Sequence, residues 1–349
     1  MNAKLLVLAI CAPLALVLDH FEQSPIVVFA LAATAIVPLS SYLEEATEAL
    51  SHYLGPTVGS LLNSTLGNLP ELIISLAALS KGLDVIVKAS IAGSILGCLL
   101  LSLGLAMIAG GIGRVQQHFN PVSAGLNSAL LFLAVVALLV PWVFHITTSE
   151  KSRGVSVEMA IVLLAVYAAG LVFSLITHHQ ILGRPQTHGD EEPPTLGKAQ
   201  AFGLLVGAAV VLAFLSEALT GSIEPATTML GLSDIFAGMF LLAGVGNLAQ
   251  IINAVRFARK DNMDLALGVT LQASMQMALL VAPLLVLLDL FIGDGKMNLI
   301  FTSFEAFALL IAVQGIRNLI PDGESNWIEG VMLVAIYVLL GIGVFYLPE

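Results

Sequence analysis

The chain has 349 residues, of which 58% are hydrophobic and only 11% are charged, whereas soluble domains carry about a quarter charged residues. This composition excludes a soluble globular protein, because a single domain of this length cannot bury so much apolar surface. The formal net charge of −11 excludes nucleic acid as a partner, because the sequence has no basic stripe that could neutralise phosphates.

About eleven apolar segments follow one another along the chain, and each is long enough to cross a bilayer core of ~30 Å as a helix. The first could also be a signal peptide, but no small-x-small cleavage site follows it and further spans come directly after, so we interpret it as a transmembrane helix. The sequence therefore predicts an all-α polytopic membrane protein. The spans are expected at residues 3–18, 25–50, 57–80, 84–111, 122–145, 155–177, 199–220, 231–258, 263–290, 297–320 and 326–347.

One clearly polar linker, residues 178–198, contains the run Gly-Asp-Glu-Glu-Pro-Pro and is expected to be solvated. It separates an N-terminal helix (1–20) and a first half (25–177) from a second half (199–349). Eight of the 13 Lys and Arg residues fall on the side of this linker, which by the positive-inside rule predicts a cytoplasmic N-terminus and an extracytoplasmic C-terminus. The compact chain favours a bacterial or archaeal cell inner membrane.

The two halves carry related polar motifs. Residues 67–79 are GNLPELIISLAAL and residues 246–258 are GNLAQIINAVRFA. Five predicted spans separate the copies, and because five is odd the copies enter the membrane from opposite sides, as in the inverted repeats of secondary transporters. The alignment pairs three polar positions: Asn68 with Asn247, Glu71 with Gln250, and Ser94 with Ser274.

Glu71 lies near the middle of its predicted span, where a charged side chain costs ~2.5–3.5 kcal/mol on insertion scales. A protonated or paired carboxyl that only packs helices is the structural alternative, but the same spot recurs in the second copy, so we favour an ion site. Glu71 and Gln250 are the expected cation ligands. The wider candidate site for ion binding and proton coupling is Glu71, Asn68, Gln250, Asn247, Ser94, Ser274 and Gln276.

Other acidic residues could supply an accessory charge. Glu305 is the strongest candidate, because it is expected deep inside the span 297–320. Glu48 lies with Glu44 at the cytoplasmic end of the second span, and Glu224 lies at the outer end of the seventh. For these three an interfacial, solvated position is the favoured interpretation, although an acidic vestibule would also concentrate cations.

Several segments resemble the calcium/proton exchanger family, a branch of the calcium/cation antiporter superfamily. They include ATEALSHYLG at 46–55, LLNSTLGNLPELIISLAALSKG at 61–82, VGNLAQ at 245–250 and FARKDNMDLALGV at 257–269, and the resemblance covers nearly the whole chain. It implies one N-terminal helix, two inverted five-helix repeats, and exchange of Ca2+ for H+ between two facing acidic helices. The second-repeat motif diverges: Gln250 and Ile251 replace the family's Glu-His, and Gln272 and Ala273 interrupt a Gly-Ser-Ser run. In the first repeat, Cys98 replaces an Asn.

The predicted function is a secondary cation/proton antiporter, most simply a Ca2+/H+ exchanger working by alternating access between the repeats. Because the Gln250 amide cannot ionise, a monovalent (Na+)/H+ exchanger and a non-transporting paralogue stay open as alternatives. No Walker loop or nucleophile–His pairing points to an enzyme, and no cofactor is expected beyond the transported ions. The expected partners are the lipid bilayer, Ca2+ or another cation, and protons, and a homo-oligomer is left open.

Overall fold

The computed structural model describes residues 3–22, 24–54, 56–148, 153–173, 196–292 and 295–347. Its first half is helical apart from one short strand. The elements are α1 (Ala3–His20), α2 (Pro25–Leu54), α3 (Pro56–Leu66), α4 (Leu69–Ser80), α5 (Asp84–Leu96), the π-helix η1 (Gly97–Ser102), α6 (Leu103–Gly111), β1 (Gln117–His118), α7 (Pro121–Thr148) and α8 (Arg153–Val172).

The second half repeats this pattern of long and interrupted helices. Its elements are α10 (Lys198–Leu230), α11 (Asp234–Phe236), η3 (Ala237–Leu242), α12 (Ala243–Arg259), α13 (Met263–Gln276), η4 (Met277–Val281), α14 (Ala282–Asp289), α15 (Ser303–Leu319), β2 (Glu324–Ser325) and α16 (Trp327–Phe345). The two short strands pair antiparallel and join the ends of α6 and α16.

The prediction of an all-α membrane protein is confirmed, because every predicted span is helical over most of its length. Within the described residues, eight helical stretches are long and apolar enough to cross a membrane. The other three predicted spans are α1, the broken pair α3–α4, and α15. The predicted linker 178–198 lies largely in residues 174–195, outside the described residues.

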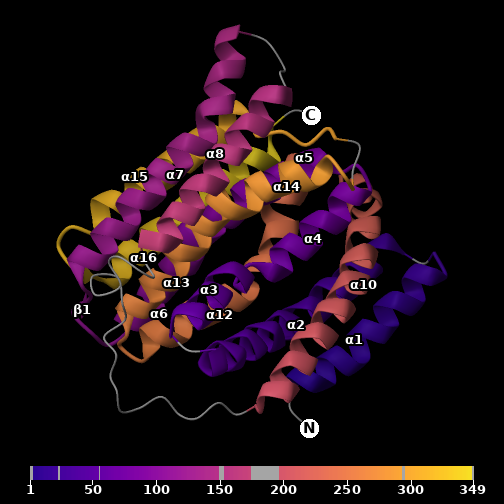
Figure 1. Ribbon diagram of the computed structural model, residues 1–349, viewed down its shortest axis with the longest axis horizontal. Helices are drawn as coiled ribbons and strands as arrows, with labels where there is room; N and C mark the ends of the chain where they lie inside the picture. Colours follow the sequence, from indigo (N-terminus) through magenta and orange to yellow (C-terminus); the bar gives the residue numbers. More distant parts are fainter. Residues whose placement is uncertain are drawn as a thin grey trace.

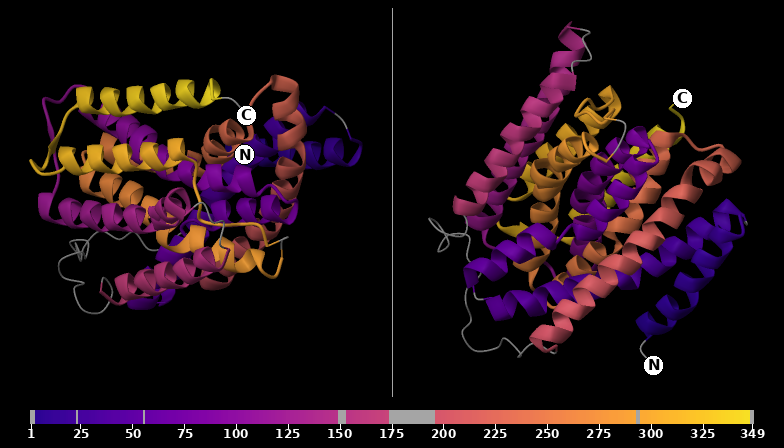
Figure 2. Two further views of the ribbon diagram at one scale, coloured as in Figure 1. Left: turned by 90° about the horizontal axis from the view of Figure 1, so that it is seen from above. Right: turned by 45° about the vertical axis from the view of Figure 1, so that its right-hand side comes forward.

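Two interrupted helices form the centre of the molecule. The stretch α5–η1–α6 is the most buried of the long helices, and α13–η4–α14 is next. α2 and α10 pack side by side at one edge with α1 outside them (Figures 1 and 2). The N-terminus and C-terminus lie at opposite ends of the molecule in Figure 1 and again in the right-hand view of Figure 2.

The two halves touch through backbone where α5 crosses η3. A Cβ added to Gly93 would collide with the carbonyl of Met239, and a Cβ added to Gly238 would collide with the carbonyl of Ile86. Both crossings therefore need glycine, because no side chain can occupy the space between the backbones. This contact brings polar segments from the two halves together in the middle of the fold.

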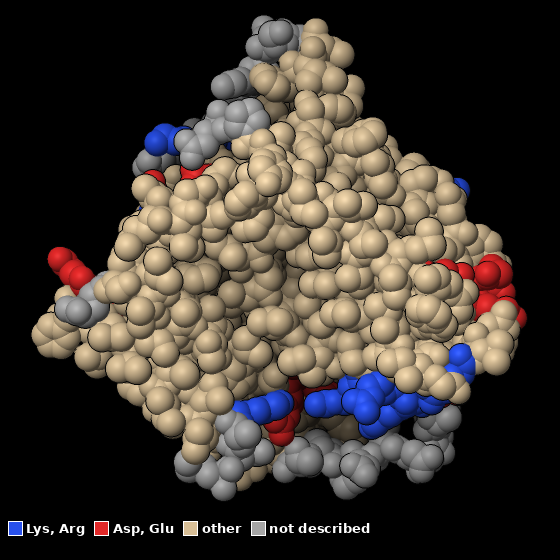
Figure 3. Space-filling view, turned by 180° about the vertical axis from the view of Figure 1, so that it is seen from behind, with Lys and Arg blue, Asp and Glu red and all other residues tan. Residues whose placement is uncertain are grey.

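Basic side chains mark one edge of the molecule. Figure 3 shows Lys and Arg gathered along its lower edge, with Asp and Glu between them. Arg114, after α6, donates to the carbonyl of Arg259 at the end of α12 and lies 3.5 Å from the Asp261 carboxylate. By the positive-inside rule this is the expected cytoplasmic edge.

Candidate functional site

The site begins at a break between α3 and α4. Helix α3 ends at Leu66 and α4 begins at Leu69, with Gly67 and Asn68 between them. Pro70 has no N–H to donate back to the preceding turn, so it suits the first turn of a new helix and not the interior of a continuous one. The break frees the Asn68 side chain and sets Glu71 in the first turn of α4, where the helix dipole favours a carboxylate.

Three other interruptions are π-helical. η1 and η4 occur at matching places in the two long central helices, directly after Leu96 and Gln276, and η3 precedes α12. Single π-helical turns are rare and often occur at functional sites, because they rotate the side chains that follow. All three adjoin the helices that carry the predicted site residues.

All the hydrogen bonds of the Asn68 side chain to described residues are made with the second half. Its Nδ2 donates to Gln276 Oε1 at 2.9 Å and to the Ala273 carbonyl at 3.4 Å. Its Oδ1 accepts from Gln250 Nε2 at 2.8 Å. The predicted pairing of the two polar motifs is therefore a physical contact between α4 and the helices α12 and α13.

Gln250 is the hub of this network. Besides its bond to Asn68, Gln250 Nε2 donates to Glu71 Oε1 at 3.1 Å. Its Oε1 accepts from the Cys98 thiol, with 2.9 Å between sulfur and oxygen. Both amide hydrogens of Gln250 are thus committed, and its oxygen accepts one bond of the two that it can accept. Gln250 therefore fixes the positions of Asn68, Glu71 and Cys98.

Glu71 is 5% exposed, and its two carboxylate oxygens differ. Oε1 is held by Gln250, whereas Oε2 is buried and has no hydrogen-bond partner among the described residues. A buried carboxylate oxygen without a donor costs free energy unless a proton or a cation occupies it. Gly246 makes room for this side chain, because a Cβ there would lie 3.0 Å from Glu71 Cγ.

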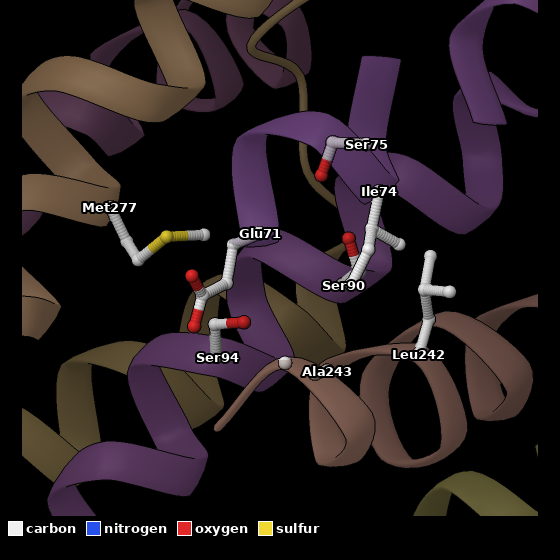
Figure 4. Close-up of a pocket in the computed structure, with 9 residues that line it drawn as sticks. Glu71, Ile74, Ser75, Ser90, Ser94, Leu242, Ala243 and Met277 are labelled. Atoms are coloured by element: carbon white, nitrogen blue, oxygen red, sulfur yellow. The ribbon is translucent and has the colours of Figure 1, made fainter. Parts of the chain in front are cut away.

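A small pocket adjoins Glu71. Its volume is about 10 Å³, which is about the room that one water molecule needs, so a dehydrated ion would also fit. Figure 4 shows the Glu71 carboxylate between Met277 and Ser94, with Ser75 and Ser90 to its right. The pocket walls on α12 are Ala243 and Gly246, toward the N-terminal end of that helix from Gln250.

The remaining predicted site residues lie close by with smaller roles. Asn247 Nδ2 donates to the Ser94 carbonyl at 3.3 Å, and Asn247 Oδ1 lies 3.8 Å from the Cys98 sulfur. Ser274 is fully buried, donates to the carbonyl of Thr270 in its own helix, and also contacts the Cys98 thiol. The structure therefore gathers all seven predicted ion-site residues from α4, α5, α12 and α13.

The three predicted accessory acids, Glu305, Glu48 and Glu224, take no part in the hydrogen bonds described above. Glu305 was expected deep in a span that begins at 297, but α15 begins at Ser303, so Glu305 occupies the first turn of the helix. Its Oε2 accepts from the N–H and hydroxyl of Thr302, which makes it half of a capping box. The capping bonds occupy Oε2 of Glu305, and its accessory role at the ion site stays a prediction. Glu48 and Glu224 are exposed, in keeping with their interfacial interpretation.

One polar pair near the site was not among the predicted site residues. Glu44, on α2, accepts a hydrogen bond at 2.7 Å from Nδ2 of Asn253, which follows Gln250 by three residues on α12. Cys98 was noticed only as a departure from the family pattern, yet it donates to Gln250. The spacing of Gln250 and Asn253 was the available signal, because residues three apart share one helix face.

Comparison with known proteins identifies the family of the chain. A family model described as sodium/calcium exchanger protein matches residues 24–176 and 200–346. The chain is 39% identical to a Ca2+/H+ antiporter of Synechocystis, over 98% of this chain and 97% of that protein. It is also 39% identical to the Ca2+/H+ antiporter ChaA of Bacillus subtilis, over 96% of each chain.

Two solved structures are similar in fold. The structure of native YfkE superposes with a TM-score of 0.85 at 34% identity, covering 99% of this chain and 100% of that one. The crystal structure of the H+/Ca2+ exchanger CAX gives a TM-score of 0.77 at 16% identity, covering 99% and 88%, and shows the shared fold alone. The resemblance to calcium/proton exchangers is confirmed, and the chain belongs to the sodium/calcium exchanger protein family of secondary transporters.

Proposed function

We propose that the chain exchanges Ca2+ for H+ across a membrane, using Glu71 as the group that binds either ion. The observation that carries this proposal is the buried Oε2 of Glu71, which no described residue satisfies. A proton and a cation would compete for this oxygen, so each must leave before the other binds. Competition at one site is sufficient for exchange without separate pathways.

The surroundings of Glu71 suit a hard cation. Ca2+ takes six to eight oxygen ligands, including carboxylates, carbonyls, hydroxyls and waters. The pocket beside Glu71 is lined by Ser75, Ser90 and Ser94. Asn247 donates to the carbonyl of Ser94, and Asn68 shares the Gln250 amide with Glu71. Na+ would accept the same oxygens, and because Glu71 alone balances one positive charge, a monovalent ion is the second candidate.

The proposed transport cycle moves one half of the chain against the other. We treat residues 25–177 and 199–349 as two inverted repeats that follow the N-terminal helix, residues 1–20. Glu71 and Asn68 accept hydrogen bonds from Gln250, and Asn68 donates one to Gln276, so these bonds cross from one repeat to the other. Breaking and remaking these bonds would expose Glu71 to each side in turn. In this proposal the protein lies in the inner membrane of the cell, and its N-terminus and basic edge face the cytoplasm.

The test is transport by the purified chain in liposomes with an imposed pH gradient. We expect proton-driven Ca2+ uptake that Glu71→Gln abolishes, because the amide keeps the shape of the side chain but takes up neither proton nor charge. Flux driven by Na+ or K+ but not by Ca2+ would replace Ca2+ with a monovalent ion. Absence of flux for every cation, with Glu71→Gln indistinguishable from the parent, would indicate a non-transporting member of the family.

A further inference from the structure

Gln250 leaves the proposed exchange short of one negative charge. Glu71 carries a single charge, whereas Ca2+ carries two, and a residual positive charge in a site of low effective dielectric is unfavourable. Gln250 cannot supply the difference, because its amide is neutral. Glu305 is engaged elsewhere, because its Oε2 accepts from the N–H and hydroxyl of Thr302 at the start of α15.

Glu44 lies beside Asn253, about one turn of α12 beyond the contact of Gln250 with Glu71. Its Oε2 is held by Asn253 in the same way that Glu71 Oε1 is held by Gln250, at 2.7 and 3.1 Å respectively. Gln250 and Asn253 are three residues apart on α12, which places their Cβ atoms about 5–6 Å apart on one face of the helix. The two carboxylates are therefore anchored to neighbouring amides of one helix.

Glu44 differs from Glu48, its acidic neighbour on α2, in its burial. Among the described residues, Lys4 from α1, Arg256 from α12 and Glu48 on α2 act electrostatically on Glu44, and Glu44 in turn acts on Glu71. Glu48 is exposed, whereas Glu44 is partly buried between α2 and α12. Because Asn253 follows Gln250 toward the basic end of α12, Glu44 lies on the side of Glu71 opposite the pocket.

We propose that Glu44 is the second acidic group of the ion site: from the far side of Glu71 it balances the second charge of the cation that Glu71 binds, and it takes up the second proton when the cation leaves. The unsatisfied Oε2 of Glu71 marks the buried end of this site, and Glu44 marks the end nearest the basic edge. Two carboxylates balance a divalent ion in one state and two protons in the other, so the charge of the site stays constant. The inference rests on the proposed function, because it assigns the second carboxylate that Ca2+ exchange requires.

The experiment is Ca2+ titration of the purified full-length chain by calorimetry in buffers of different ionisation enthalpy, which reports affinity and protons released together. We expect Glu44→Gln to weaken Ca2+ binding at least tenfold, about 1.4 kcal/mol. We also expect release at mildly acidic pH to fall from about two protons per Ca2+ to about one, because the bound cation displaces the protons of the carboxylates that balance its charge. The matched control is Glu158→Gln, which removes an exposed carboxylate from α8, a helix that does not pack on α2, and should behave as the parent.

A second variant asks whether the charge itself matters. Adding Gln250→Glu to Glu44→Gln restores one carboxylate beside Glu71, and we expect it to recover both Ca2+ affinity and the second proton. Asn253→Ala keeps the Glu44 carboxylate but removes its hydrogen bond, so affinity should fall while the proton count stays at about two. This variant also serves if Glu44→Gln does not yield folded protein.

The outcomes separate this inference from the proposed function. If the parent binds Ca2+ and Glu71→Gln abolishes binding, while Glu44→Gln matches the parent in affinity and proton count, Glu44 is not part of the site and exchange at Glu71 still holds. If the parent neither binds nor transports Ca2+, the proposed function fails and this inference fails with it. If Glu158→Gln weakens binding as much as Glu44→Gln, the effect is one of net charge, which also overturns the assignment.

Discussion

Gly246 sets how closely Glu71 can approach α12, and Gly246→Ala tests that contact. The new Cβ would lie 3.0 Å from Glu71 Cγ and 3.5 Å from both Cδ and Oε1. Carbon atoms in contact prefer about 3.5–4.0 Å, so Glu71 would have to retreat by roughly half an ångström or more. Overpacking of this kind costs about 1–3 kcal/mol, and the retreat would also lengthen the bond from Gln250.

The control is Gly244→Ala, two residues earlier on the same helix, where a Cβ would meet nothing within 4 Å. Because alanine favours helix over glycine by about 0.5–1 kcal/mol, Gly244→Ala should be neutral or slightly stabilising. We therefore expect Gly246→Ala to lower the apparent melting temperature in detergent relative to Gly244→Ala, and to weaken proton-driven Ca2+ uptake in liposomes.

A double-mutant cycle identifies the contact responsible. In a Glu71→Ala background the Cγ is gone, so the stability cost of Gly246→Ala should largely disappear. An equal cost with and without the Glu71 side chain would refute the argument, because the strain would then lie in the backbone or in another neighbour.

Two further predictions concern residues around this contact. Cys98→Ala removes the thiol that donates to Gln250 Oε1 and leaves a buried acceptor unsatisfied, at a cost of about 1–3 kcal/mol. Cys98→Ser keeps a donor and should retain most of the stability. Thermal unfolding of the two variants checks this. Glu305→Gln weakens the capping box with Thr302 and should reduce stability by up to about 1 kcal/mol, while calorimetry shows Ca2+ affinity within twofold of the parent; a larger loss of affinity would return Glu305 to the ion site.

Much of the fold could be predicted because membrane spans leave a strong compositional trace. An apolar run long enough to cross the bilayer has to be helical there, since lipid offers the backbone no hydrogen-bond partners. The break before α4 also leaves a trace, because Gly67 and Pro70 interrupt an otherwise apolar segment. The repeat alignment pairs Glu71 with Gln250 and Asn68 with Asn247, and the structure joins both Glu71 and Asn68 to Gln250 by hydrogen bonds.

Other features could not be predicted, or were predicted wrongly, for identifiable reasons. The π-helical turns leave no mark in the sequence, because a shift of hydrogen-bond register inside an apolar run changes no residue type. The contact of Glu44 with Asn253 joins residues far apart in the chain and depends on how α2 packs on α12. Glu305 is the opposite case, because its sequence signal is local. Thr302, three residues earlier, forms a capping-box pattern with Glu305, and this pattern predicts the position of Glu305 in the helix better than its depth in an apolar run does.

Position 250 carries an amide in place of a carboxylate, and as a result the two oxygens of the Glu71 carboxyl group have different roles. Gln250 donates to Oε1, and this bond can persist whether or not Glu71 carries a proton, because Oε2 remains the free oxygen. The α4–α12 contact is then held in both charge states, whereas two facing carboxylates would repel each other whenever neither proton nor cation lay between them. Positioning thus falls to Oε1 and ion exchange to Oε2, and the charge that Gln250 lacks must come from beyond the pair, where Glu44 is the carboxylate anchored one turn away.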